Sequence, residues 1–149
     1  MSKQVRKRTI LIADDEAEVV QLVQMILEWE GYNVVVAADG LETLQRAEAD
    51  KPDLILLDVR MPKMSGLAVL EHLATSEASR IPVIMLSVVT THPEVRSALQ
   101  RGAVAYLSKP FELKEMTRLV AQILAMDTAK RDAFRQKALE NIDRGWYTS

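Results

Sequence analysis

The sequence has 149 residues, of which 48% are hydrophobic and 27% charged, which is typical of one globular domain and excludes a disordered chain. Its apolar runs are about five residues long, far below the roughly 20 that span a bilayer, so we expect no membrane partner. The absence of cysteine excludes disulfides and thiol chemistry and indicates a cytoplasmic protein.

Five short apolar runs recur along the chain and predict the strands. They cover residues 10–13, 34–37, 54–57, 83–86 and 104–107. The runs are continuous rather than alternating, as expected for strands that are buried on both faces of a parallel sheet between helices.

Helical patterns separate these runs. The first places Val19, Leu22, Val23, Ile26 and Leu27 on one helical face. Comparable spacings occur within residues 41–47, 67–73, 95–99 and 116–124. The alternation of strand and helix predicts an α/β fold with a doubly wound, five-stranded parallel sheet and right-handed crossovers.

The last helical pattern is expected to continue beyond a domain of residues 9–126. No glycine or proline occurs from Glu112 to Arg144, so the helix could extend as a single rod of about 45 Å. An apolar stripe of Phe134, Ala138, Ile142 and Trp146, with Leu139 beside it, marks residues 127–149 as a helical extension. This extension either folds back on the domain, pairs with a second copy or a partner, or links to an effector.

Chemically active residues follow the predicted strands. Asp14 and Asp15 follow the first strand, Asp58 the third, Ser87 the fourth and Lys109 the fifth. Ligands of open α/β sheets bind at the carboxyl ends of the strands, where these side chains are expected to converge. Clustered carboxylates select a hard cation such as Mg²⁺, and together with an ammonium and a hydroxyl they suit a phosphoryl group.

Each residue alone has a simpler explanation. Asp15 and Glu18 have the spacing of a capping box for the first helix. Asp58 could cap a loop, and Lys109 could be a solvated charge. All of them together, each at the end of its strand, favour a functional site.

At these positions the sequence resembles the receiver domain of two-component response regulators, the chemotaxis-regulator-like family. The matching stretches are ILIADDE at residues 10–16, LILLDVRMP at 54–62, VIMLS at 83–87 and GAVAYLSKPF at 102–111. The resemblance implies a flavodoxin-like fold with strand order 2-1-3-4-5 and a cis peptide bond between Lys109 and Pro110.

The resemblance also implies roles at the site. Asp58 would accept a phosphoryl group as an acyl phosphate. Asp14 and Asp15 would hold Mg²⁺ together with Asp58 and the backbone carbonyl of Arg60. Lys109 would pair with Asp58 and then with the phosphate. The donor would be a sensor histidine kinase or a phosphotransfer protein, and the chain would act as a phosphoacceptor regulator rather than as an enzyme.

Two further residues would respond to phosphorylation, and two depart from the family pattern. Ser87 would bond a phosphate oxygen, and Tyr106 would rotate inward behind it. Val88 stands where the family usually has a small residue, and Arg60 is a long cation two residues after Asp58. We expect Val88 and Arg60 to tune the rate of hydrolysis, although both could simply point to solvent.

The output of the switch stays open between docking on an unknown downstream protein and forming a homodimer. We expect no direct nucleic acid partner, because residues 9–126 are acidic and no helix-turn-helix is recognisable. One alternative is a receiver-like interaction module that works without phosphorylation. Another is an aspartate-nucleophile phosphatase of the haloacid dehalogenase type, which is disfavoured because Arg60 stands where that class needs a second acid.

Overall fold

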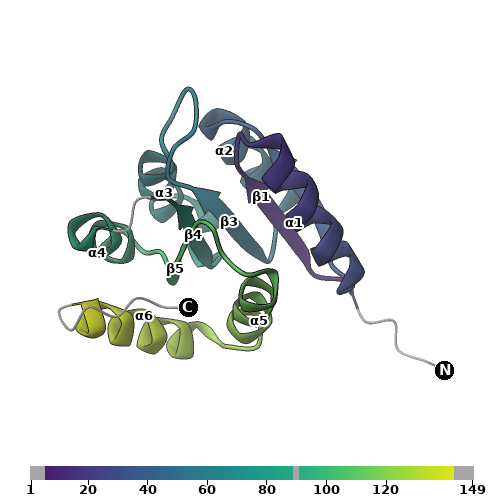
Figure 1. The fold of residues 1–149 in the computed structure, drawn as a ribbon. Helices are drawn as coiled ribbons and strands as arrows, with labels where there is room; N and C mark the ends of the chain where they lie inside the picture. The colour runs from purple at the N-terminus through teal and green to yellow at the C-terminus, as the bar shows by residue number, and fades with distance from the viewer. Residues whose placement is uncertain (1–5, 89–90, 143–149) are drawn as a thin grey trace.

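The computed structural model describes residues 6–88 and 91–142, and Figure 1 draws its fold. Five strands form one parallel sheet in the order β2-β1-β3-β4-β5, which confirms the predicted class and strand order. Each predicted run forms one strand. The strands are β1 (Thr9–Ala13), β2 (Asn33–Ala37), β3 (Leu54–Asp58), β4 (Val83–Ser87) and β5 (Ala105–Ser108).

Helices cover both faces of the sheet. They are α1 (Ala17–Trp29), α2 (Gly40–Asp50), α3 (Gly66–Ala74), α4 (His92–Gln100), α5 (Leu113–Leu124) and α6 (Thr128–Ile142), with a short 3₁₀ helix η1 (Glu77–Arg80). Helices α1 and α5 enclose one hydrophobic cluster with the sheet, and α2, α3 and α4 enclose another. Within the described ranges, no helix has the length and hydropathy needed to cross a membrane.

Helix α1 buries most of the predicted face, with Val19 and Ile26 packed beside the buried residues, but its start differs from the simpler explanation considered for Asp15. Glu16 is the N-cap residue and makes no side-chain capping bond, so the capping box proposed for Asp15 and Glu18 is wrong. The helix buries Val20, Val23 and Leu27, whereas Leu22 is 45% exposed. Apolar residues lie on more than one side of this helix. Their spacing alone therefore does not decide whether Val20 or Leu22 is buried, and packing against the sheet does.

Two features of the loops shape the carboxyl edge of the sheet. Gly66 begins α3 so close to β3 that a Cβ atom there would collide with the backbone oxygen of Asp58. Its N–H also donates to the oxygen of Val59 over 2.7 Å. The peptide bond between Lys109 and Pro110 is cis, as the family resemblance implies.

The single rod expected at the C-terminus is not formed. Helix α5 ends at Leu124, and α6 begins at Thr128 and folds back to pack against α4 and β5. Burial of Ala138 and Ile142 in the cluster with α4 accounts for this turn, because a continuous rod would leave both side chains in water. Trp146 lies outside the described residues.

Candidate phosphoryl and metal site

Four of the predicted site residues lie at the carboxyl edge of the sheet. Asp58 and Ser87 are the last residues of β3 and β4, while Asp14 directly follows β1 and Lys109 directly follows β5. The parallel register aligns these strand ends. Asp58, Ser87 and Lys109 line one hollow of about 250 Å³, together with Asp15, Glu16, Arg60 and Val88.

Lys109 lies at the centre of the site, between three carboxylates. Its Nζ atom lies 2.7 Å from Oδ2 of Asp14, 3.2 Å from Oδ2 of Asp58 and 3.2 Å from Oε1 of Glu16. The lysine side chain is 8% exposed, and the Asp14 and Asp58 side chains are at least as well buried. One ammonium therefore compensates two buried carboxylates and the exposed carboxylate of Glu16, and the group keeps a net negative charge.

Burial and the neighbouring charges shift the pKa values of Asp58 and Lys109. Burial raises the pKa of Asp58 to about 6, and the charge of Asp14 adds to the shift, while a backbone hydrogen bond from Arg60 and the charge of Lys109 oppose it. Burial disfavours the charged form of Lys109, but its hydrogen bond and charge interactions with Asp14 outweigh burial, so the pKa of the amine is raised.

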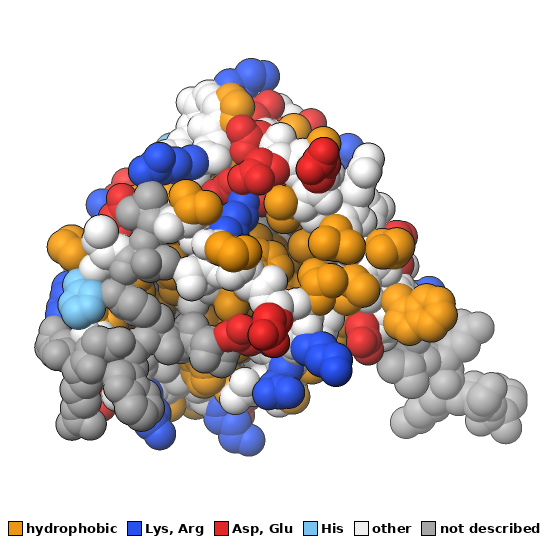
Figure 2. All heavy atoms as spheres, in the orientation of Figure 1, with side chains coloured by type: hydrophobic (Ala, Val, Ile, Leu, Met, Phe, Trp, Pro, Cys, Tyr) orange, Lys and Arg blue, Asp and Glu red, His pale blue; other side chains and the backbone are white. Residues whose placement is uncertain are grey.

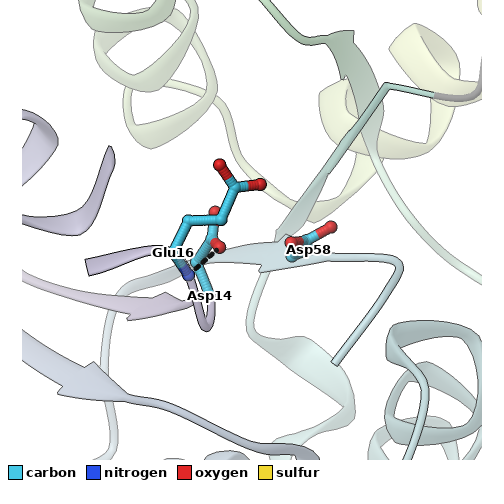
Figure 3. A group of neighbouring side chains, drawn as sticks. All are labelled: Asp14, Glu16 and Asp58. Carbon is cyan, nitrogen blue, oxygen red and sulfur yellow. Dashed lines mark hydrogen bonds between the residues drawn. The ribbon is translucent and has the colours of Figure 1, made fainter. Parts of the chain in front are cut away.

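Three carboxylates meet closely enough to share one cation. One oxygen from each of Asp14, Glu16 and Asp58 lies within 4.8 Å of the others. Figure 3 shows Asp14 and Glu16 reaching from the loop between β1 and α1 towards Asp58. The N–H of Glu16 donates to Oδ1 of Asp14 over 2.9 Å, which orients that carboxylate. Hard oxygen ligands of this kind fit Mg²⁺.

Sequence reasoning missed Glu16. Asp15 and Glu16 are both exposed and both line the hollow, but only Glu16 has a carboxylate oxygen close to those of Asp14 and Asp58. The available signal was the run of three consecutive acids, Asp14, Asp15 and Glu16, which does not reveal which of them face the sheet edge. Asp15 as a metal ligand stays a prediction.

The remaining predicted residues surround this centre. Arg60 is exposed, and its backbone N–H donates to Oδ1 of Asp58 over 3.1 Å. Val88 is 62% exposed at the rim of the hollow. Ser87 is buried in its wall, and Tyr106 is buried further back on β5, within the cluster that also contains α4 and α6 residues.

An apolar groove of about 380 Å³ adjoins the site. Val19, Leu22, Phe111 and Leu113 contribute to its walls, and it shares Glu16, Val88 and Lys109 with the acidic hollow. Exposed Met25 and Trp29 continue the apolar surface along α1. Figure 2 shows hydrophobic side chains gathered on this face of the molecule. The acidic hollow thus opens beside a surface suited to protein contact.

Comparisons with known proteins agree with this geometry. A family model described as the response regulator receiver domain matches residues 10–121. The chain is 40% identical over 117 residues to the alkaline phosphatase synthesis transcriptional regulatory protein PhoP of Bacillus subtilis, covering 78% of this chain and 48% of that protein. The chain spans about half the length of the curated relatives it matches.

Solved structures share the fold. A CheY-like response regulator receiver domain protein from Methanospirillum hungatei has a TM-score of 0.76 and 29% identity, covering 80% of this chain and 94% of that one. The receiver domain of the sensor histidine kinase PA1611 from Pseudomonas aeruginosa has a TM-score of 0.75 and 28% identity, covering 81% and 100%. That structure has a magnesium ion coordinated in its active-site cleft.

Proposed function

Because the chain belongs to the receiver-domain family of two-component response regulators, we propose that it is a phosphorylation-dependent signalling switch. Asp58 accepts a phosphoryl group from a sensor histidine kinase or a phosphotransfer protein. The observation that carries this proposal is the position of Asp58, which is buried and 3.2 Å from Lys109 yet lines an open hollow that a donor can reach.

In the transfer step, a carboxylate oxygen of Asp58 attacks the phosphorus of a phosphohistidine. The new O–P bond forms an acyl phosphate, the P–N bond breaks, and its electron pair stays on the imidazole. Lys109 compensates the charge on the phosphoryl oxygens, and the Ser87 hydroxyl donates a hydrogen bond to one of them. Hydrolysis by water returns inorganic phosphate and the free Asp58 carboxylate.

The acidic residues beside Asp58 would hold Mg²⁺. Asp14, Glu16 and Asp58 have the close carboxylate oxygens for this, and the family resemblance adds Asp15 and the backbone carbonyl of Arg60. When bound, the ion would neutralise charge on the transferring phosphoryl group. Figure 3 shows Asp14 and Glu16 next to Asp58.

The donor reaches Asp58 past Val88 and Glu16, both of which also line the apolar groove beside α1. The homologue PhoP from Bacillus subtilis is named as a transcriptional regulator. For residues 9–126 of this chain we propose no direct contact with nucleic acid. The output proposed for the chain is docking on a downstream protein or pairing with a second copy.

The test is intact-mass spectrometry after incubation with acetyl phosphate and MgCl₂. We expect a gain of one phosphoryl group that hydroxylamine removes, since an acyl phosphate is labile to this nucleophile. Excess EDTA should slow the gain by about a hundredfold or more, because a cation at a phosphoryl group contributes several kcal/mol. A chain that gains no phosphoryl group, or gains one at the same rate in EDTA, would contradict the proposal and favour a phosphorylation-independent interaction module.

Val88 and Arg60 are expected to lengthen the lifetime of the phosphorylated state. Both side chains line the hollow from its solvent side, where water must enter to attack phosphorus. Val88→Ala and Arg60→Gln should each speed dephosphorylation by about three- to tenfold, equivalent to roughly 1 kcal/mol in the barrier. The decay of the phosphorylated mass with time measures this. Leu41→Ala, at an exposed leucine of α2, is the control, and lifetimes equal to the wild type in both variants would refute the prediction.

A further inference from the structure

Helix α6 lies across the edge of the sheet formed by β5. Phe134 packs against the cluster under α1 and α5, whereas Ala138, Leu139 and Ile142 belong to the cluster under α4. The helix therefore bridges the two hydrophobic layers over the edge strand, as Figure 1 shows below α4 and β5. Covering an edge strand with a helix prevents its unpaired backbone groups from pairing with another chain.

The two edge strands of the sheet therefore differ in how deeply they are buried. At the other edge, β2 leaves Asn33 exposed and Val34–Val36 only partly buried. At the α6 edge, Ala105, Tyr106 and Leu107 of β5 are each at most 2% exposed. Release of α6 would uncover part of an apolar surface that the folded-back helix now protects.

Helix α6 packs mainly on α4, yet most of its side chains are not buried. Only Ala138 and Ile142 among its 15 residues are buried. Its polar ties to neighbouring helices include the Arg131 side chain donating to the oxygen of Ile123 and that of Arg135 donating to the oxygen of Leu99. Phe134 and Leu139 add only partly buried packing. A helix whose side chains are mostly open to water detaches at a lower cost in free energy than the helices of the core.

The turn before α6 is not imposed by its own residues. Residues 125–127 are Ala, Met and Asp, with no glycine or proline. Asp127 caps α6 by accepting from the N–H of Lys130 over 2.8 Å. The same three residues are compatible with a continuous helix, so packing on α4 and β5 decides between the folded-back and the extended arrangement.

The phosphoryl site is connected to this packing through β5. Lys109, whose ammonium binds Asp58, directly follows the strand, and its N–H donates to the oxygen of Ser87 over 2.8 Å. Tyr106 lies three residues earlier, in the same hydrophobic cluster as Ala138 and Ile142. A phosphoryl group on Asp58 would offer Lys109 a new partner at the end of the strand against which α6 packs.

We propose that α6 is a detachable cover of the β5 edge and α4, and that phosphorylation of Asp58 releases it. The proposal rests on the proposed phosphoacceptor function. In the unphosphorylated chain α6 blocks this face. In the phosphorylated chain α6 opens, and the apolar residues of α4, β5 and α6 become accessible.

Thiol reactivity tests this directly, because the chain has no cysteine of its own. Ala138→Cys places a single thiol in the buried face of α6, and Ala47→Cys places one at a similarly buried position of α2 as the matched control. Alkylation rates are measured with and without acetyl phosphate and MgCl₂, and intact mass gives the phosphorylated fraction of each sample.

We expect phosphorylation to raise the alkylation rate of Ala138→Cys by about tenfold or more, since the rate follows the population of the open form. Ala47→Cys should not respond, and adding Asp58→Asn to Ala138→Cys should remove the response. A phosphorylated sample with an unchanged or lower rate would overturn the release of α6 while leaving the phosphoacceptor function intact. A chain that never gains a phosphoryl group would overturn both.

Hydrogen exchange of the unsubstituted chain is the second measurement, needed if Ala138→Cys does not fold. Amide protection in residues 128–142 should fall on phosphorylation, while protection in α2 should stay the same. Unchanged or increased protection of α6 in a phosphorylated sample would overturn the proposal.

Discussion

Asp58→Asn is expected to abolish phosphoryl acceptance and, at the same time, to stabilise the fold at neutral pH. The amide cannot form the acyl phosphate, so intact mass should show no gain with acetyl phosphate and MgCl₂ under conditions that label the wild type. The stability gain has a separate cause, because the native carboxylate is confined near Asp14 in a poorly hydrated place.

The pH dependence of this gain follows from the raised pKa of Asp58, about 6 against an ordinary value of 3.8. At acid pH, below the ordinary value, the carboxyl is protonated in both the folded and the unfolded chain and has no effect. As the pH rises between these two values, the unfolded chain releases the proton first, so the folded state loses stability. Above the pKa that Asp58 has in the folded protein, the loss of stability is constant. Asp58→Asn avoids this loss because an amide does not ionise.

After allowance for partial solvent screening, we expect Asp58→Asn to raise the free energy of unfolding by about 1–2 kcal/mol at neutral pH. Urea unfolding in EDTA, at acid and at neutral pH, measures the difference. Asp39→Asn is the control. A backbone hydrogen bond from Glu42 lowers the pKa of Asp39, so the effect of this substitution on stability should depend on pH with the opposite sign. A wild type as stable as Asp58→Asn at neutral pH, or a gain confined to acid pH, would contradict the prediction.

Lys109→Met is expected to produce the largest loss of stability at the site. Methionine retains much of the length of the side chain but removes the only ammonium within bonding distance of Asp14, Glu16 and Asp58 in the part of the chain that the structure describes. Buried carboxylates without a compensating cation are strongly destabilising. We expect a loss of about 2–3 kcal/mol at neutral pH in EDTA.

Excess MgCl₂ should restore much of that loss, because a cation bound to the same carboxylates replaces the missing charge and stabilises the folded state by mass action. Urea unfolding with and without MgCl₂ measures both effects. Lys63→Met is the matched control, since Lys63 is 62% exposed and water screens its ion pair with Asp39, so its loss should change the stability little. Equal stability of Lys109→Met and the wild type in EDTA would show that the ammonium does not compensate the three carboxylates.

The sequence predicts most of the fold, because its main signals are local. Continuous apolar runs define all five strands to within one residue at each end. The buried face of α5, including Met116, Val120 and Ile123, follows from helical spacing alone. Most of the predicted face of α1 is confirmed, since Val23 and Leu27 are buried and Val19 and Ile26 pack against the same cluster, but Leu22 is exposed.

The site was predictable in its composition but not in its detail. Carboxylates after β1 and β3 and a lysine after β5 must approach one another once the sheet is parallel. Which of the three consecutive acids approach Asp58 depends on where α1 begins: Asp14 and Glu16 do so in the structure, and Asp15 as a metal ligand stays a prediction. The raised pKa of Asp58 depends on burial and on Asp14, neither of which is local in sequence.

By itself, the sequence determined the strands, their parallel arrangement and the kinds of chemical group at the carboxyl edge. Neighbouring residues encode these features, through hydrophobic period and through the residue that follows each strand. Only the tertiary structure decided the ion pair between Lys109 and Asp14, which are 95 residues apart, and the turn that folds α6 onto β5. Both depend on burial shared between distant segments, and residues 125–127 contribute only the Asp127 cap at the start of α6.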